Sequence, residues 1–390
     1  MMLLTMSRGL RLAQLVAVVM IPWTTGDCQS PRREPQPRGW SVDTVPLLDI
    51  SGNLPSGAPK LGDPIAATRL SRGRIVVADR SLPAVLYFDA TGGLTRTAGR
   101  KGKGPDEFDD LTWLGQCRAD SVFVLDGSLH RMTVLDASGK MVRQERFPME
   151  VYQDRIACNR NGRFAAIGNV RGGDHVDVKT WTFAPVRGSV SVSDPGGRFA
   201  EVLSDIPVRV PRPLGQTTTM ALSSTHLYVG TNDSAVVDRF TLSGARAGRL
   251  PVHVSRQRPT ARQYDMAIDA HLAFMFPSMA ERREHKSRFT RIPPPEFRPL
   301  YGEVIADATG TAWVVISALD EPKTRLQVLS DGAGPAAVIT LPRSMRLFEI
   351  GPDYVLGRYD DEEGEVHLVV YRLTRGAGPT PAARGRAPRE

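Results

Sequence analysis

The sequence lacks the short motifs that identify common enzymes and metal sites. Its seven histidines and three cysteines form no H-x-H, H-E-x-x-H or C-x-x-C pattern, which excludes the usual metal sites built from neighbouring residues. No serine stands in the G-x-S-x-G context of a nucleophile elbow. A site assembled in space from distant segments would escape this search, so a metal bound in that way stays open.

A phosphate-binding loop is also missing, although GRKGKGPDEF (99–108) resembles one at first sight. A loop of that kind needs G-x-x-x-x-G-K-[ST] between a strand and a helix. Here Pro105 follows Gly104 in place of the lysine, and Asp106 replaces the hydroxyl residue. The residues after the loop continue as a strand, so the sequence predicts a structural role for this segment.

The net charge of +8 is concentrated at the two ends of the chain. Five arginines stand against two acidic residues over residues 1–39, and four stand against one over residues 374–390, which leaves +2 for the rest. Nucleic-acid binding requires a basic patch or stripe on the folded body. The charge distribution therefore argues against a nucleic-acid partner.

The N-terminus has the order of a signal peptide. Arg8 and Arg11 precede an apolar stretch over residues 12–21, and small or polar residues follow up to Gly26. The stretch is shorter than the ~20 residues that span a bilayer, and a buried N-terminal helix is the alternative. We expect a signal peptide over 1–26, a flexible linker over 27–39 and a secreted or periplasmic protein without a transmembrane segment. A lipid anchor at Cys28 is a second reading, which Asp27 disfavours.

Six similar windows occur along the body of the chain. Each contains an apolar or small residue, a polar turn and a short β run: LSRGRIVVAD (70–79), CRADSVFVLD (117–126), CNRNGRFAAIG (158–168), LSSTHLYVGT (222–231), ADATGTAWVVI (306–316) and IGPDYVLGRY (350–359). Several are followed by a second β run, often through a Gly-containing hairpin turn. Three of the five spacings between window starts (47, 41, 64, 84 and 44 residues) fit the ~40–50-residue period of a propeller blade. The pattern predicts four-stranded units, two of which are followed by insertions.

The longest spacing contains the only strongly helical segment of the body, at about 258–288. Its residues Tyr264, Ile268 and Leu272 recur at helical spacing. We expect this apolar stripe to pack down on one propeller face, with Pro277 splitting or kinking the helix. The insert is then the expected region of partner contacts, with Tyr264, Ile268, Leu272 and Phe276 as candidate residues.

The sequence resembles the NHL-like six-bladed β-propellers of exported bacterial proteins. The resemblance covers roughly residues 40–373 and is strongest where ADRSLPAVLYFDATGGLTRTAGRKGKGPDEF follows the family pattern. The family's G-P-G-E-F motif appears here as residues 104–108, with Asp106 in place of the second Gly. The resemblance implies an all-β fold, a six-bladed β-propeller with the helical insertion between blades 4 and 5. It also implies that the loop crosses between blades, with Phe108 packed between them and Glu107 bonded to local backbone or arginine.

The two ends of a propeller must meet to remove exposed strand edges. The run WSVDTVPLLDI (40–50) has β character but no blade of its own. We expect it to complete the sixth blade beside residues 354–373. The tail over 374–390 is expected to be disordered.

Cys117 and Cys158 begin the second and third windows at equivalent positions. Equivalent positions in neighbouring blades lie side by side, and an exported protein matures in an oxidising compartment. The sequence therefore suggests a disulfide between them, with two buried free thiols as the alternative.

Asp79 and Asp126 occupy one place in two repeats. Because the aspartate recurs at the same place in the repeat, we interpret it as a hairpin cap that bonds backbone N–H groups, with acid–base chemistry or calcium binding as the alternative. The run DDEEGE (360–365) is interpreted as a turn with solvated charges. His130 and His226 are candidate metal ligands near equivalent blade ends, and a solvated surface histidine is the simpler interpretation of each.

The first functional hypothesis is an exported, non-catalytic propeller that binds an unidentified protein, peptide or glycan across one face, as a monomer and without a cofactor. The alternative is a lyase or lactonase-like hydrolase that uses a divalent metal at the channel mouth.

Overall fold

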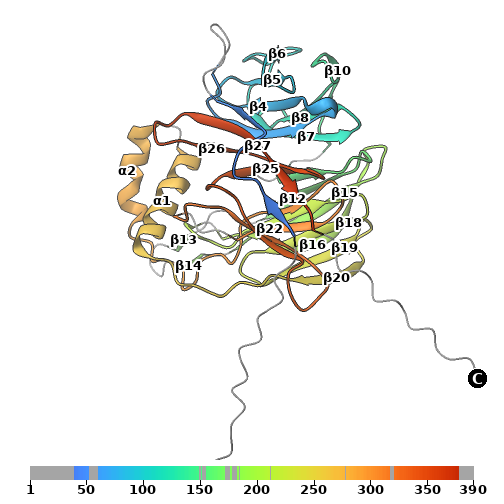
Figure 1. Cartoon of the computed structure of the whole chain (residues 1–390). Coiled ribbons are helices and arrows are strands. Elements are labelled where there is room, and N and C mark those ends of the chain that lie inside the picture. The colour runs from blue at the N-terminus through green and yellow to red at the C-terminus, as the bar shows by residue number, and fades with distance from the viewer. Residues whose placement is uncertain are drawn as a thin grey trace, which may run out of the picture. The chain divides into compact units, whose positions relative to one another are not determined.

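The computed structural model describes residues 39–51, 60–148, 151, 155–171, 176–177, 182–183, 185–210, 212–276, 278–316 and 320–376. The expected signal peptide, Cys28 and residues 377–390 of the expected tail lie outside the described residues. The described residues form six antiparallel sheets of four or five strands, arranged as a β-propeller with one helical insertion (Figure 1). The predicted fold class is therefore confirmed.

Blades 1 to 3 follow one another along the chain. Blade 1 contains β3 (Pro64–Arg69), β4 (Ile75–Asp79), β5 (Ala84–Phe88) and β6 (Leu94–Ala98), with a short 3₁₀ turn η1 (Ser71–Gly73). Blade 2 contains β7 (Leu111–Arg118), β8 (Ser121–Asp126), β9 (Arg131–Leu135) and β10 (Met141–Arg146). Blade 3 contains β11 (Ile156–Cys158), β12 (Phe164–Arg171), β15 (Val186–Ser193) and β16 (Phe199–Arg209), and its insertion holds a small hairpin, β13 (Val176–Asp177) and β14 (Thr182–Phe183).

Blades 4 to 6 complete the ring. Blade 4 contains β17 (Thr218–Leu222), β18 (His226–Thr231), β19 (Val236–Thr241) and β20 (Arg246–Pro251). Blade 5 contains β21 (Val304–Ala306), β22 (Ala312–Val315), β23 (Arg325–Val328) and β24 (Ala337–Thr340). Blade 6 contains β25 (Arg346–Ile350), β26 (Tyr354–Asp360) and β27 (Val366–Thr374), joined by β1 (Ser41–Val42) and β2 (Leu48–Ile50). Each predicted window spans the junction between the first two strands of one blade.

The first strand of each blade lines the propeller axis. Contacts between these inner strands run all the way round the ring: β3 with β7, β7 with β11, β11 with β17, β17 with β21, β21 with β25, and β25 with β3. All six inner strands start at the same face, because every blade repeats the same up-and-down order. We call this the insert face, since the helical insertion lies over it.

The hydrophobic core is divided among the blade interfaces. Six clusters of buried residues lie between successive blades, and the last joins blade 6 to blade 1. Side chains alternate between the two faces of a strand, and both faces of a blade are covered by neighbours. Strands β4 (IVVAD) and β5 (AVLYF) are accordingly buried at every residue, which explains why the windows read as continuous apolar runs.

The loop 99–110 crosses from blade 1 to blade 2. Phe108 is 1% exposed and packs in the cluster shared by these blades. The Glu107 carboxylate accepts hydrogen bonds from the Gly104 N–H and the Arg100 guanidinium, both at 2.9 Å. The backbone bond to Gly104, followed by the bond to Arg100, holds the pKa of Glu107 below its ordinary value. Both expectations for this loop are confirmed.

The insertion between blades 4 and 5 forms two helices, α1 (Ala261–Met275) and α2 (Met279–Phe289). Each begins with a capping box, formed by Thr260 with Gln263 and by Ser278 with Glu281. Pro277 lies outside the described residues. Neither described helix is long and apolar enough to cross a membrane.

The apolar stripe of α1 packs towards the propeller. Tyr264, Ile268 and Leu272 are 7%, 1% and 1% exposed and cluster with Leu214 of the loop between β16 and β17. Gln263 donates a hydrogen bond of 2.7 Å to Asp320, in the connection between β22 and β23. Both loops lie where the inner strands begin, so the insert covers the blade 4 and blade 5 side of this face.

The N-terminal segment closes the ring. Strand β1 pairs with β27 through Ser41–Thr374 and Val42–Leu373, and β2 pairs with β27 through residues 48–50 and 368–370. Ile50 and Leu48 also join the cluster between blades 6 and 1. The expected completion of the sixth blade by residues 40–50 is confirmed.

Removing residues 40–50 should destabilise the protein far more than removing residues 376–390, because only the first deletion exposes an edge of β27 and part of a core cluster. Thermal melts of a chain starting at residue 51 and a chain ending at residue 375, each against the chain from residue 39, measure the difference. Equal melting temperatures would contradict closure by the N-terminal strands.

His367 ties the same two segments together electrostatically. One ring nitrogen lies 3.0 Å from the Asp49 carboxylate of β2, and the other lies 3.2 Å from Asp361. Burial alone would lower the pKa of His367, but the hydrogen bonds and charges of Asp49 and Asp361 outweigh it and raise that pKa above its ordinary value. The charged imidazolium is therefore the form that the closed ring favours.

This contribution should be fully present below the ordinary histidine pKa of ~6.5 and lost as the pH rises through the elevated pKa of the folded protein. Replacing His367 with Gln should lower the melting temperature more at pH 5.5 than at pH 9. A melt series on both chains across this range is the measurement. A pH-independent difference would show that His367 acts through packing alone.

Candidate functional site

An axial cavity of about 590 Å³ runs through the propeller. Its lining includes residues of all six inner strands, and β11, β21 and β25 line it over their whole length. Polar and aliphatic side chains both line it, with the partly buried rings of Trp113 and Phe348 among them. Preformed concave spaces of this kind are the usual places of ligand sites.

At the far end of the cavity, opposite the insert face, polar side chains from several blades are hydrogen-bonded to one another. The Glu349 carboxylate accepts hydrogen bonds from the Thr68 hydroxyl at 2.7 Å, the Arg69 N–H at 2.8 Å and the Tyr354 hydroxyl at 2.9 Å. Arg160 of blade 3 forms an ion pair with it at 3.2 Å. This network joins blades 1, 3 and 6, so its groups are engaged in structure.

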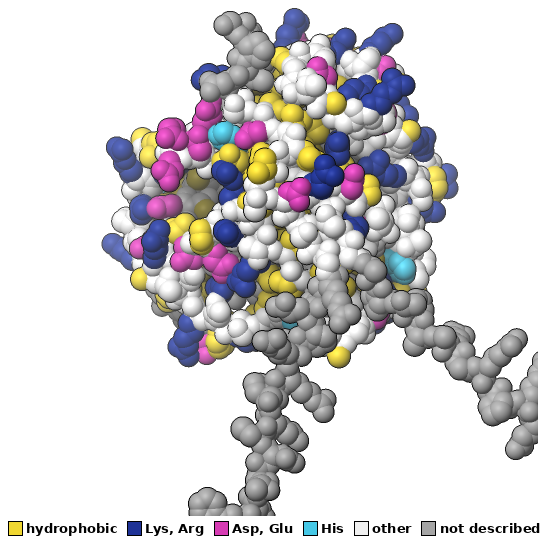
Figure 2. Space-filling view, in the orientation of Figure 1, with side chains coloured by type: hydrophobic (Ala, Val, Ile, Leu, Met, Phe, Trp, Pro, Cys, Tyr) yellow, Lys and Arg dark blue, Asp and Glu magenta, His cyan; other side chains and the backbone are white. Residues whose placement is uncertain are grey.

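The insert-face end is different, because two arginines there have no carboxylate partner among the described residues. Arg155 precedes the inner strand of blade 3 and Arg346 begins that of blade 6, and both line the cavity. Arg346 lies over the Phe348 ring at 5.7 Å. Glu303 lines the same end and has no described cation partner. Figure 2 shows acidic and basic side chains interspersed around the insert, so this face carries charges of both signs.

A smaller pocket of about 310 Å³ lies beside the start of blade 2. It brings together Asp110 and His130 with Thr112, Ser128 and the ring of Phe147. Burial raises the pKa of Asp110, although the positive charge of Arg80 opposes this. His130 lies in the turn between β8 and β9, whereas His226 begins β18 at the opposite end of its blade. The two histidines therefore do not share one blade end, contrary to the expectation from the sequence.

Asp79 and Asp126 are completely buried and serve the backbone. Asp79 accepts hydrogen bonds from the N–H groups of Gly62, Asp63 and Ser81. Asp126 accepts the corresponding bonds from residues 109, 110 and 129. Each carboxylate fixes the segment that enters an inner strand, and the structural interpretation of this repeated aspartate is confirmed.

The described residues bring together one group suited to hold a metal ion, formed by Asp361, Glu365 and His367. It lies at the hairpin between β26 and β27, where Asp361 also accepts the Glu365 N–H at 2.7 Å. Both nitrogens of His367 already face carboxylates. The arrangement is accounted for as an ion-paired turn that belongs to ring closure.

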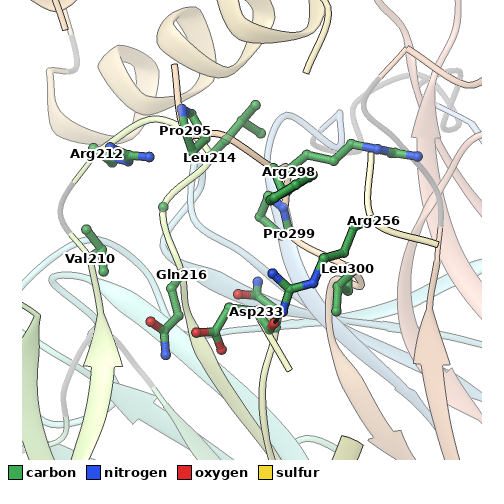
Figure 3. A pocket seen from close by; sticks show the side chains of 13 residues that line it. Val210, Arg212, Leu214, Gln216, Asp233, Arg256, Pro295, Arg298, Pro299 and Leu300 are labelled. Carbon is green, nitrogen blue, oxygen red and sulfur yellow. Dashed lines mark hydrogen bonds between the residues drawn. The ribbon is translucent and has the colours of Figure 1, made fainter. Parts of the chain in front are cut away.

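Residues 252–260 and 290–303 connect the two helices of the insert to blades 4 and 5, and we call them its stems. A third pocket, of about 230 Å³, opens between blade 4 and these stems (Figure 3). Arg212 and Arg256 approach it from opposite sides, whereas the Arg298 side chain extends away from it. Arg298 instead reaches Gln257 and lies 3.9 Å from Glu321. Leu214, Pro295 and other apolar residues form much of the wall.

The candidate contact residues of the insert lie on its underside, which faces the propeller. Tyr264 donates a hydrogen bond of 2.7 Å to the Ile292 carbonyl, and Ile268 and Leu272 are buried against Leu214. Phe276 is partly buried and stacks on His285 at 4.3 Å. These side chains hold the insert in place, so partner contacts by the insert would have to come from its outer surface and its stems.

Cys117 and Cys158 form a disulfide between the inner strands β7 and β11, with their Cα atoms 5.4 Å apart. Cys117 is fully buried, and Cys158 lines the axial cavity. The bond fixes the spacing of blades 2 and 3 towards the far end of the cavity, where β7 and β11 end. Arg155 precedes β11 and lies at the opposite end of this short strand.

Several site residues carried no signal in the sequence. Arg155, Arg346 and Glu303 belong to no motif and come from three blades. Their common feature is a position at the start of an inner strand, which becomes visible only after the strands have been assigned.

Comparisons with known proteins support the fold. A scan against protein-family models and a search of curated proteins each gave no match. Among solved structures, a member of the DUF4221 family from Bacteroides vulgatus aligns with a TM-score of 0.50 and 9% identity, over 87% of this chain and 99% of that one. An exported-protein candidate from Bacteroides fragilis aligns with a TM-score of 0.46 and 11% identity, over 85% and 94%. At these identities the likeness concerns the fold alone.

Alkylation of the unfolded, unreduced protein should leave Cys117 and Cys158 unlabelled, because their sulfur atoms are joined. Reduction should add two labels, and it should cost roughly 4 kcal/mol of stability on the chain-entropy model for a loop of this size. Peptide mass mapping reads the result. Cys28, in a chain that begins at Asp27, is the internal control for complete labelling, and labels on both other cysteines before reduction would refute the bond.

Proposed function

We propose that this protein is an exported, non-catalytic β-propeller of the NHL-like kind that binds a protein, peptide or glycan ligand across the insert face. The order of charges and apolar residues before Gly26 supports export. The observation that carries the binding function is the contrast between the two ends of the axial cavity.

Blades 3 and 6 contribute charged residues at both ends. At the far end they supply Arg160 and Glu349, which pair at 3.2 Å. At the insert-face end they supply Arg155 and Arg346, which have no described carboxylate partner. A guanidinium group offers five N–H donors suited to carboxylate, sulfate or phosphate oxygens. A ligand with anionic groups entering from the insert face would satisfy these donors.

The rest of the cavity suits recognition by shape. Its walls are backbone-paired strands that cannot easily move, and the disulfide between β7 and β11 fixes one side. A preformed site loses little ordering entropy when a ligand binds. The Trp113 and Phe348 rings add apolar surface for a sugar ring or a side chain.

Screening the mature protein on defined peptide and glycan arrays should yield a ligand that carries anionic groups. Replacing Arg155 and Arg346 together with Glu should weaken its binding at least tenfold, because attraction becomes repulsion. Isothermal titration with the ligand found on the array measures this. Arg249→Glu, on the outer strand of blade 4, is the matched charge-reversal control and should bind as the parent protein does.

Excising residues 258–297 provides a second arm of the same test. The Arg298 N–H donates to the Gln257 carbonyl at 2.9 Å, so the two stems can be joined by a short linker. A folded propeller with altered ligand binding is expected. Turnover of the bound ligand, or binding that requires a stoichiometric divalent metal, would instead favour the lyase or lactonase-like alternative.

A further inference from the structure

The pocket between blade 4 and the insert stems has a rigid frame. The Leu300 N–H donates to the Asn232 carbonyl at 2.7 Å, and the Asn232 N–H donates to the Thr217 carbonyl at 3.2 Å. Gly215 closes the turn on the other side, where an added Cβ would lie 2.2 Å from the Val210 carbonyl oxygen. These bonds join blade 4 to the insert, so the pocket is preformed.

Asn232 does for blade 4 what Asp79 and Asp126 do for blades 1 and 2. Its Oδ1 accepts the N–H of Thr217, the residue before the inner strand, at 2.8 Å. A carboxylate in this role is only an acceptor, whereas an amide keeps the acceptor and adds two N–H donors. Asn232 is 7% exposed and lines the pocket, and its Nδ2 has no partner among the described residues. The Nδ2 group is therefore a donor that a ligand acceptor in the pocket can use.

Other polar groups lie at the same base. Figure 3 shows Gln216 and Arg256, which carry N–H donors, gathered there beside the carboxylate of Asp233. Arg256 donates one hydrogen bond, to the Asp233 carbonyl at 3.3 Å, which leaves most of its N–H groups available. The side-chain amide of Gln216 has no described hydrogen-bond partner. The base of the pocket therefore offers amide and guanidinium donors to an anionic oxygen, with the Asp233 carboxylate as the one acidic group among the described residues of its lining.

Much of the remaining wall is apolar, and Arg212 lies at its upper edge (Figure 3). The apolar residues are Leu214, Pro295, Phe297, Pro299 and Leu300. The volume of about 230 Å³ exceeds the ~150 Å³ cavity that is known to admit benzene. An aromatic or large aliphatic group therefore fits above the donors.

We propose that this pocket binds the C-terminal residue of a peptide, with its carboxylate at Asn232 and Arg256 and its apolar side chain against Phe297 and the prolines. This inference rests on the proposed binding function and names the ligand chemistry of one part of the face. A free carboxylate is matched by the amide and guanidinium donors. A neutral sugar would place its hydroxyl groups against the proline-rich wall, which offers them no hydrogen-bonding partners.

The test compares N-acetyl-L-phenylalanine with N-acetyl-L-phenylalaninamide, which differ only in the carboxylate. Binding is followed by isothermal titration and by protein NMR shifts in the full mature chain. The acid should bind at least tenfold more tightly than the amide. Asn232→Asp should remove this preference without lowering the melting temperature, because Asp79 and Asp126 show that a carboxylate can hold the backbone at such a turn.

Arg256→Gln should also weaken the acid at least tenfold, and Arg249→Gln, outside the pocket on the same blade, should leave it unchanged. Equal affinities for acid and amide, unaltered binding by Asn232→Asp, or no binding of the acid by the parent chain would each overturn the inference. An array ligand that depends on Arg155 and Arg346 would still support the proposed function, so the two ideas fail separately.

Discussion

The structure depends on closing a ring of blades, each of which buries its two faces against its neighbours. Arg375, directly after β27, fastens the last blade to blade 5. Its guanidinium donates to the Asp307 carboxylate at 2.8 Å and to the carbonyls of Pro352 and Gly351 at 2.7 Å each. Asp307 is 5% exposed overall, its carboxylate is inaccessible, and it also accepts the Trp313 indole N–H. Removing one partner of such a buried pair is costly, because the other charge remains unsatisfied.

Closure determines what the axis can offer. Once the ring is complete, the first residues of the six inner strands form one circle around the axis, and their last residues form another. The charged side chains of each circle can either pair with one another or remain without a partner. At the far end, Glu349 bonds to groups from three blades. At the insert-face end, Arg155 and Arg346 have no described carboxylate partner. The insertion between blades 4 and 5 covers part of this open end and adds a second pocket at its stems.

The fold was accessible from the sequence because its signals are local and repeated. The six windows, the hairpin glycines and Phe108 each report a feature that one blade needs regardless of its neighbours. The candidate site was not accessible, since Arg155, Glu303 and Arg346 come from different blades and are separated by up to 191 residues. The stripe formed by Tyr264, Ile268 and Leu272 was identified, but a helical period alone cannot tell an anchoring face from a contact face. All three side chains are buried against the loop before blade 4, so the stripe is an anchoring face.

Repetition separates structural residues from functional ones in this molecule. Asp79 and Asp126 fix the chain that enters the inner strands of blades 1 and 2, and their carboxylates accept backbone N–H groups and serine hydroxyls. In blade 4, the Asn232 Oδ1 accepts the corresponding backbone N–H, and its amide nitrogen has no described partner. This amide lies beside the stems of the helical insertion. Asn232 keeps the structural hydrogen bond that an aspartate makes in blades 1 and 2, and it adds an amide donor that this bond does not use. Such an additional donor is a good candidate for a ligand contact.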